Sequence, residues 1–224
     1  MEKKRLSNPG PVNLYINDCR EKALQRAILK QSLDGVKTHL ADGTTIEWLD
    51  LELPVEFSRN SRRKCIDLVG RDNNDRYVLC ELKHGCNENN CPHDAEIEAL
   101  TYLGQICLHC KDLDDNNIHR PYVYIRNKDE KYKLPTFLWF DFVKSNPRVL
   151  ILADKTYWNY WRERKERQKK NKKNKRSIGI HDSSIECFSI DVEYDYFEKQ
   201  RNYSRESSYV PELYDKNHWE KESI

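Results

Sequence analysis

The chain has 224 residues, which allows one domain with an appendage or two small domains and excludes two large lobes. Charged residues make up 34% of it against a typical ~25%, yet 11% aromatic residues and several apolar runs exclude wholesale disorder, and no run approaches the ~18 residues of a membrane span. The net charge is only +2, and the first residues lack the apolar stretch of a secretory signal, so we expect a cytoplasmic protein with no membrane partner.

A helix followed by a β-meander is predicted for the first part of the chain. Asp18 stands three residues before Glu21, as in a capping box, and apolar residues then recur at helical spacing as far as about Ser32 to Gly35. Stretches rich in β-formers come next, separated by polar turns, at residues 44–57, 64–70 and 75–83. We expect these stretches to pair in succession.

A second helix is predicted from Ala95 to about Cys110, with Asp94 as its N-cap. Its apolar residues should share one buried face: Ile97, Leu100, Gly104, Cys107 and Leu108. Two strands with a short element between them should follow, at residues 121–127, 137–143 and 148–154. This order of elements predicts an α/β layered domain over residues 1–155.

The remaining chain divides into a basic segment, 156–184, and a C-terminal extension, 185–224, made of an alternating strand and a polar tail. Ten of the 39 Lys and Arg residues but two of the 37 Asp and Glu residues fall at 162–176, so that strip carries +8 and the other residues −6. Such a strip indicates a polyanionic partner, and we expect it to be mobile when alone and to contact nucleic acid. The lysines expected to contact phosphate are Lys169, Lys170, Lys172, Lys173 and Lys175.

Residues 65–85 carry the most informative chemistry. Asp67 is the single acid in an apolar strand, and Glu81 and Lys83 share a face of the next strand because side chains alternate with period two. If the hairpin is symmetric about Asn74, Asp67 lies directly opposite Glu81. Like charges opposed in this way destabilise a sheet, and a bound Mg²⁺, which prefers oxygen ligands, removes the conflict. The lysine beside them can orient or deprotonate a water, or stabilise charge on a phosphate.

This pattern resembles the PD-(D/E)xK nuclease superfamily, in which an acid on one strand precedes an acid-x-Lys triplet on the next. Thirteen residues separate Asp67 from Glu81, and Ile66 stands where the family has a proline that is not a ligand. The resemblance implies a restriction-endonuclease-like mixed β-sheet core flanked by helices, and an Mg²⁺- or Mn²⁺-dependent nuclease. It further implies that Asp67, Glu81 and the backbone carbonyl of Leu82 bind the metal while Lys83 acts on the water.

Weaker candidates surround this motif. By order along the chain, Glu21 matches an acidic position on the family's first helix and is a candidate metal ligand, and Gln105 matches a polar catalytic position on the helix after the meander. Glu56 is a candidate third carboxylate on the preceding strand, where Glu52 has the same parity, and a solvated strand face explains both equally well. Glu98 lies on the same side of its helix as Gln105. An arginine cluster leads into the Asp67 strand and is expected to contact the nucleic-acid backbone: Arg59, Arg62 and Arg63.

The cysteines leave a further alternative open. In a cytoplasmic chain they are expected to be reduced, and burial of Cys107 in its helix favours a packing role. A structural zinc is chemically permissible on four of them, Cys86, Cys91, Cys107 and Cys110.

The leading hypothesis is a metal-dependent nuclease, with DNA as the expected substrate and the choice between endonuclease and exonuclease left open. One alternative is a catalytically inactive nuclease-fold protein that binds nucleic acid through the basic segment and an aromatic cluster, Tyr157, Trp158, Tyr160 and Trp161. The same aromatic run has helical spacing and can instead anchor the segment on the body. Another alternative is an assembly subunit that binds a protein partner or a second copy.

Overall fold

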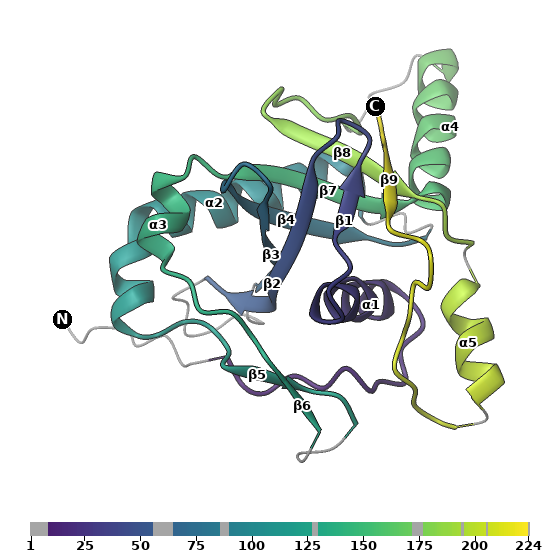
Figure 1. Ribbon diagram of the computed structural model, residues 1–224. Helices are drawn as coiled ribbons and strands as arrows, with labels where there is room; N and C mark the ends of the chain where they lie inside the picture. Colours follow the sequence, from purple (N-terminus) through teal and green to yellow (C-terminus); the bar gives the residue numbers. More distant parts are fainter. Residues whose placement is uncertain are drawn as a thin grey trace.

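A curved β-sheet with helices on both faces forms the centre of the protein (Figure 1). α1 (Glu21–Leu33) packs against one face, whereas α2 (Pro92–Asp115), α3 (Trp139–Lys144) and α4 (Lys155–Asn171) pack against the other. Each face of the sheet therefore has its own apolar core. The computed structural model describes residues 9–55, 65–85, 90–126, 130–171, 177–193, 195–204 and 206–223.

The predicted meander is present as three antiparallel strands, β2 (Thr45–Pro54), β3 (Cys65–Asp72) and β4 (Tyr77–Lys83). In the β3–β4 hairpin Leu68 lies opposite Cys80, and the pairs that follow keep the same register. The register is therefore symmetric about position 74, as predicted, and it directs Asp67 toward Glu81.

Two helical crossovers then add parallel strands. α2 and the elements after it connect β4 to β7 (Arg148–Asp154), and α4 connects β7 to β8 (Ile185–Ile190). The carboxyl ends of β4, β7 and β8 consequently lie at one edge of the sheet. The alternating strand predicted at the start of the C-terminal extension is present as β8.

The sheet closes on itself, and this closure contradicts the predicted restriction-endonuclease-like core, which is an open α/β sheet. β9 (His218–Lys221) pairs antiparallel with β8 and parallel with β1 (Thr38–Leu40), and β1 pairs with β2. The strand order is β1-β2-β3-β4-β7-β8-β9, a closed seven-stranded barrel. The prediction failed because the two closing strands are only 3 and 4 residues long and lie in polar sequence without a strand pattern.

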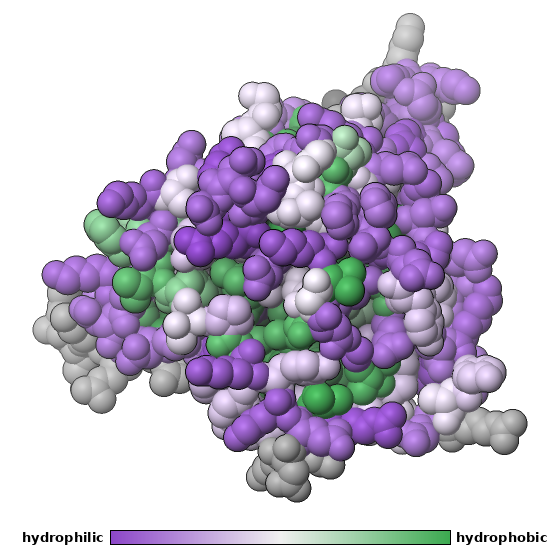
Figure 2. Space-filling view, in the orientation of Figure 1, coloured by the Kyte–Doolittle hydropathy of each residue, from purple (hydrophilic) through white to green (hydrophobic). Residues whose placement is uncertain are grey.

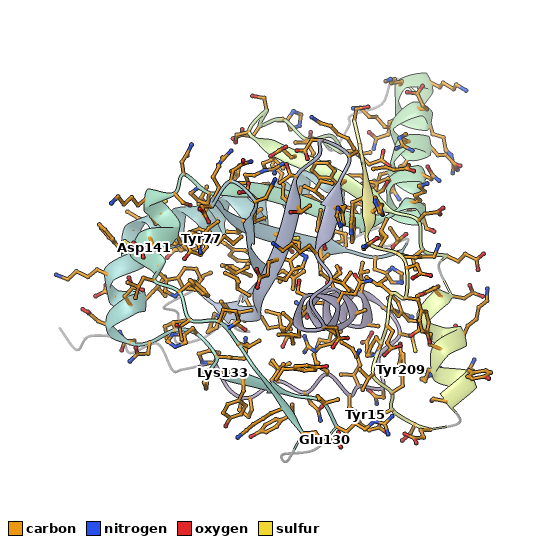
Figure 3. All side chains as sticks on the ribbon, viewed as in Figure 1. Tyr15, Tyr77, Glu130, Lys133, Asp141 and Tyr209 are labelled. Carbon is orange, nitrogen blue, oxygen red and sulfur yellow. The ribbon has the colours of Figure 1, made fainter. Side chains whose placement is uncertain are left out.

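Three smaller elements complete the fold. β5 (Tyr122–Tyr124) and β6 (Lys131–Lys133) form a separate two-stranded sheet, and α5 (Tyr196–Ser204) follows β8. The chain before α1 runs between β5 and the segment before β9, where Tyr15 and Tyr209 are labelled in Figure 3. Backbone N–H groups there donate from Leu14 to Tyr124 (2.8 Å) and from Ile16 to Tyr209 (2.9 Å). The two ends of the chain therefore support the same side of α1.

Helix α2 contains the predicted helix but begins at Pro92 and ends at Asp115, with Cys91 rather than Asp94 as its N-cap, and it buries a different face. Ile97 and Leu108, predicted to be buried, are 50% and 75% exposed. The buried apolar residues are instead Pro92, Ala95, Ala99, Tyr102, Ile106 and Leu113. Two alanines on the sheet side allow the helix to approach the strands closely, and this small-residue face is not the most hydrophobic one. At α1, Asp18 Oδ1 accepts from the N–H of Arg20 (2.7 Å), so the predicted capping box does not form.

Helix α4 extends into the basic strip, for which no helix was predicted. The basic strip is helical as far as Asn171, and its two glutamates pair with cations, Glu163 with Arg167 (2.8 Å) and Glu166 with Lys169 (2.5 Å). Its first turns are anchored as predicted, because three aromatic side chains are buried in the core: Tyr157, Trp158 and Trp161. The face over α4 is hydrophilic in Figure 2. Within the described residues, no helix has both the length and the apolar content that crossing a membrane requires.

Candidate functional site

The carboxyl end of β4 places an acid and a lysine side by side on one face of the sheet. Glu81 and Lys83 are two residues apart in an extended strand, so their side chains project in the same direction. Lys83 Nζ lies 2.5 Å from Oε1 of Glu81, and the two side chains are 3% and 5% exposed. This is a buried ion pair, and such a pair is stable only if hydrogen bonds satisfy its remaining polar atoms.

Asp67 on β3 faces the same point from the neighbouring strand. Its Oδ2 accepts a hydrogen bond from the backbone N–H of Leu82 (2.8 Å), so a side chain takes the place of the next rung of the β3–β4 ladder. In an extended strand the N–H and C=O of one residue point to the same side. The Leu82 carbonyl therefore faces the β3 side, at the level of Asp67.

A chain of side-chain contacts from α1 orients Asp67. Gln25 Nε2 donates to the backbone oxygen (2.7 Å) and to Oδ1 (3.3 Å) of Asp67. The Gln25 amide is itself held by Arg26, whose Nη1 donates to Gln25 Oε1 (2.6 Å). Arg26 also pairs with Glu52 (3.1 Å), so the side chain considered as a third carboxylate supports the site through an arginine.

Two helices add carboxylates around the lysine. Glu98 on α2 brings Oε2 to 3.3 Å from Lys83 Nζ, and its side chain is 42% exposed. Glu21, in the first turn of α1, is close enough to raise the pKa of Lys83 together with Glu81, Asp67 and Glu98. Two carboxylates, Glu81 and Glu98, thus contact the ammonium group, and the charges of Asp67 and Glu21 also act on it.

The electrostatics of these groups reflect that crowding. Burial, with smaller contributions from Asp67 and Glu98, raises the pKa of Glu21 to about 7, against the opposing effect of Lys83. Burial and the charge of Asp67 raise the pKa of Glu81 well above its ordinary value. Burial also raises the pKa of Asp67, although Lys83 and the Leu82 N–H oppose this. Burial alone would lower the pKa of Lys83, but the four carboxylates outweigh it and raise that pKa well above its usual range.

One buried oxygen in this cluster has no partner. Oε2 of Glu81 makes no hydrogen bond to any described residue, although it is shielded from solvent. A buried carboxylate oxygen left in this way costs free energy unless an ion or an ordered water satisfies it. A cation between Glu81 and Asp67 would fill that role and reduce the repulsion between the two carboxylates. The residues present therefore fit an oxygen-ligated divalent ion.

The coordination would be partial, as is usual for Mg²⁺. No three of these carboxylates bring their oxygens within 4.8 Å of one another. Among the described residues, only His93, Glu96 and His181 bring three ligand atoms that close together. Mg²⁺ commonly takes one or two carboxylates and keeps its other positions for water and substrate phosphate. Asp67, Glu81 and the Leu82 carbonyl supply that number of protein ligands.

Other predicted residues are not brought into this cluster or lie outside the described chain. Gln105 is half-buried two turns beyond Glu98, a rise of about 10 Å along α2, so Glu98 is the α2 residue that reaches Lys83. Lys169 and Lys170 are exposed near the end of α4. The following predicted residues lie outside the described part of the chain: Glu56, Arg59, Arg62, Arg63, Cys86, Lys172, Lys173 and Lys175.

The proposed four-cysteine zinc site does not form. Cys91 is the N-cap of α2 and Cys107 lies 16 residues further along the same helix, a rise of about 24 Å. Cys107 is exposed, and Cys110 lies one turn beyond it. One ion cannot reach both ends of this helix, whereas the helix predicted from the sequence began at Ala95 and so left Cys91 outside it.

Sequence reasoning missed two supports of the site. Gln25 had no signal beyond its place on α1. His84 follows Lys83 directly and lies 2.6 Å from Asp154, the last residue of β7, because parallel strands end at the same edge. Asp154 also accepts from the backbone N–H of Gly85 (2.6 Å), which fixes the chain as it leaves β4.

The arrangement combines carboxylates that could bind a cation, a lysine whose pKa is raised and a carboxyl whose pKa is about 7. These are the groups that hydrolysis of a phosphate ester needs: a cation to neutralise the phosphate, a donor for developing charge and an acceptor for the proton of water. Comparison of the chain with protein-family models, with curated proteins and with solved structures gave no match.

Proposed function

We propose that this protein is a divalent-metal-dependent phosphodiesterase that acts on nucleic acid, with DNA as the expected substrate. The observation that carries the proposal is the buried Oε2 of Glu81, which has no partner among the described residues, beside Lys83 and close to the charges of three further carboxylates. A structural ion pair would not require three further acids, whereas a cation site would. The proposal rests on this site and on the motif it shares with PD-(D/E)xK nucleases, and it does not rest on the fold.

The metal ligands in this proposal are Asp67, Glu81 and the Leu82 carbonyl, with Mg²⁺ or Mn²⁺ as the ion. When bound, such an ion neutralises phosphate charge and lowers the pKa of a bound water. Gln25 fixes the orientation of Asp67 through its bonds to Oδ1 and to the backbone oxygen. Preorganised ligands of this kind lower the cost of assembling the site at each turnover.

Lys83 acts as a charged donor in this proposal, because its raised pKa keeps the ammonium group protonated at neutral pH. It would stabilise the charge that develops on the phosphate oxygens rather than remove a proton from water. Glu21, whose pKa is about 7, is the carboxyl suited to accept that proton. The lysine and the glutamate thus divide the roles that the sequence alone assigned to Lys83.

The basic helix is the proposed contact with the nucleic-acid backbone. Lys169 and Lys170 are exposed at the end of α4, where phosphate groups can approach them. Base stacking on the aromatic run is not part of the proposal, because Tyr157, Trp158 and Trp161 are buried. Binding without cleavage, the alternative function, would use the same lysines and is an outcome of the test.

The test is cleavage of plasmid DNA, of single-stranded DNA and of RNA in Mg²⁺, Mn²⁺ and EDTA. Asp67→Asn, Glu81→Gln and Lys83→Met should each reduce the cleavage rate by at least about 10²-fold, the usual effect of removing one catalytic group. Matched controls are Asp75→Asn, at the exposed turn of the same hairpin, and Lys133→Met on β6. Both controls should keep the activity of the unmodified protein.

A second readout does not depend on knowing the substrate. At an Mg²⁺ concentration ten times its Kd, binding to the native state adds about 1.4 kcal/mol to the free energy of unfolding, which is a rise in Tm of about 3–6 °C for a chain of this size. Asp67→Asn should abolish that rise. Cleavage in EDTA, full activity of Lys83→Met, or an equal Tm rise in Asp67→Asn would contradict the proposal. Binding of DNA with no cleavage in either ion would favour the non-catalytic alternative.

A further inference from the structure

A second cluster of metal-binding side chains lies at the beginning of α2, apart from the carboxylate site. One ligand atom each from His93, Glu96 and His181 fall within 4.8 Å of one another. Nδ1 of His93 is 2.8 Å from Oε2 of Glu96, and the rings of His93 and His181 have centroids 4.9 Å apart with planes at 86°. Three different side chains thus converge on one point at the surface.

The local structure explains why they meet. His93 and Glu96 are three residues apart in the first turns of a helix, so they lie on the same side. His181 comes from the segment between α4 and β8, and that segment is held by Glu96 itself. Oε1 of Glu96 accepts from the backbone N–H groups of His181 (2.8 Å) and Asp182 (2.6 Å).

Glu96 is a buried anion with one oxygen committed to this segment. Burial alone would raise its pKa, but the hydrogen bonds from His93, Asp182 and His181 outweigh burial and lower it. The other oxygen, Oε2, faces His93 at the open side of the cluster. His93 is 30% exposed and His181 is exposed, so an ion has access to the site from solvent.

We propose that His93, Glu96 and His181 form a zinc site. Two imidazole nitrogens with one carboxylate oxygen are a common donor set for Zn²⁺, and Mg²⁺ prefers oxygen ligands throughout. Zinc bonds of about 2.1 Å in tetrahedral geometry separate the ligand atoms by about 3.4 Å, so small side-chain rotations close the cluster around an ion. A water would take the fourth position.

The ion would fasten the segment after the basic helix to α2. Glu98, which contacts Lys83, lies two residues beyond Glu96 and so points to a different side of the helix. Zinc would therefore fix the return of the chain from α4 without entering the carboxylate site. This inference goes beyond the proposed function and does not depend on it.

The experiment is competition for Zn²⁺ between a chromophoric chelator and the full-length protein after it has been stripped of metal. An excess of Mg²⁺ is present throughout to occupy the carboxylate site. The unmodified protein should bind one zinc per chain, and His93→Gln and His181→Ala should each bind zinc at least about tenfold more weakly, since even loss of an outer-shell contact often costs that much. Co²⁺ in place of zinc should give the strong visible absorption of a tetrahedral site, and the two variants should lose it.

The matched control is His109→Ala, because His109 also has an acid three residues later on the same helix, Asp112 at 3.6 Å, but belongs to no three-residue ligand group among the described residues. It should bind zinc as the unmodified protein does. Glu81→Gln should also keep its zinc, which separates this site from the carboxylate site. Equal zinc affinity in His181→Ala and the unmodified protein, or zinc lost from Glu81→Gln and kept in His181→Ala, would overturn the proposal.

Discussion

Replacing Glu21 by Gln should make the stability of the metal-free protein less sensitive to pH. The folded chain holds this carboxyl with a pKa of about 7 against an ordinary 4.5, mainly through burial and then through Asp67 and Glu98. Between these two values the folded chain retains a proton that the unfolded chain has lost. The folded state therefore binds more protons, and the free energy of unfolding falls as the pH rises through this window.

The magnitude follows from the difference in pKa. At about 1.4 kcal/mol per pH unit, a rise from 4.5 to about 7 makes ionised Glu21 cost the folded state about 3 kcal/mol at most. Glu21→Gln removes that cost, because glutamine stays neutral. The variant should match the unmodified protein near pH 4, where both side chains are neutral, and should be the more stable of the two at pH 8.

Urea unfolding in EDTA at pH 4.5, 6 and 8 measures this difference, with the pH values chosen as about the two ends and the middle of the window. Glu47→Gln is the matched control, because Glu47 is an exposed strand carboxylate outside the buried cluster. If Glu21→Gln and the unmodified protein lose stability in parallel from pH 4.5 to 8, Glu21 is not held in a crowded, buried cluster. The proton-acceptor role proposed for it would then fail as well.

Two further changes probe other parts of the structure. Asp154→Asn should destabilise the protein by about 2 kcal/mol at pH 7, because the buried carboxylate accepts charge-assisted hydrogen bonds at the end of β7. Burial alone would raise the pKa of Asp154, but His84 and the Gly85 N–H lower it. The stability that ionised Asp154 contributes is therefore complete above about pH 4 and is lost only as the pH falls through the lowered pKa. Thermal unfolding from pH 7 to 3 should show the Tm difference between Asp154→Asn and the unmodified protein becoming smaller at acid pH. Lys169→Gln combined with Lys170→Gln should reduce the slope of log K against log salt by about 1.4–1.8 for binding to a fixed oligonucleotide in EDTA, and an unchanged slope would exclude this end of α4 as the contact.

The local sequence was sufficient to predict the hairpin at the centre of the site. An apolar strand interrupted by Asp67, a polar turn and a second strand ending in Glu81 and Lys83 set both the register and the facing of the side chains, because strands alternate with period two. Helix α1 and the buried aromatic residues at the start of α4 were likewise visible from their spacing. These features depend on neighbours within a few residues, and local pattern carries that information.

The remaining features depended on contacts between distant segments. Glu98 reaches Lys83 and Gln25 reaches Asp67 only because α2 and α1 pack on opposite faces of the sheet. The sequence placed Glu98 on the polar side of its helix without showing its partner, and no signal marked Gln25. The face that α2 buries was also decided by fit to the sheet, which favoured small alanines over the more hydrophobic Ile97 and Leu108.

Contacts between distant segments also produce the closure of the sheet and the cluster of His93, Glu96 and His181. β1 and β9 are too short and polar to carry a strand pattern, and each becomes a strand because a neighbour offers it backbone hydrogen bonds. His181 meets α2 across 85 residues of chain through the bond from its N–H to Glu96. Sequence pattern predicts local conformation and which side chains share a face. Contacts between residues far apart in the sequence form only when the chain packs into its tertiary structure.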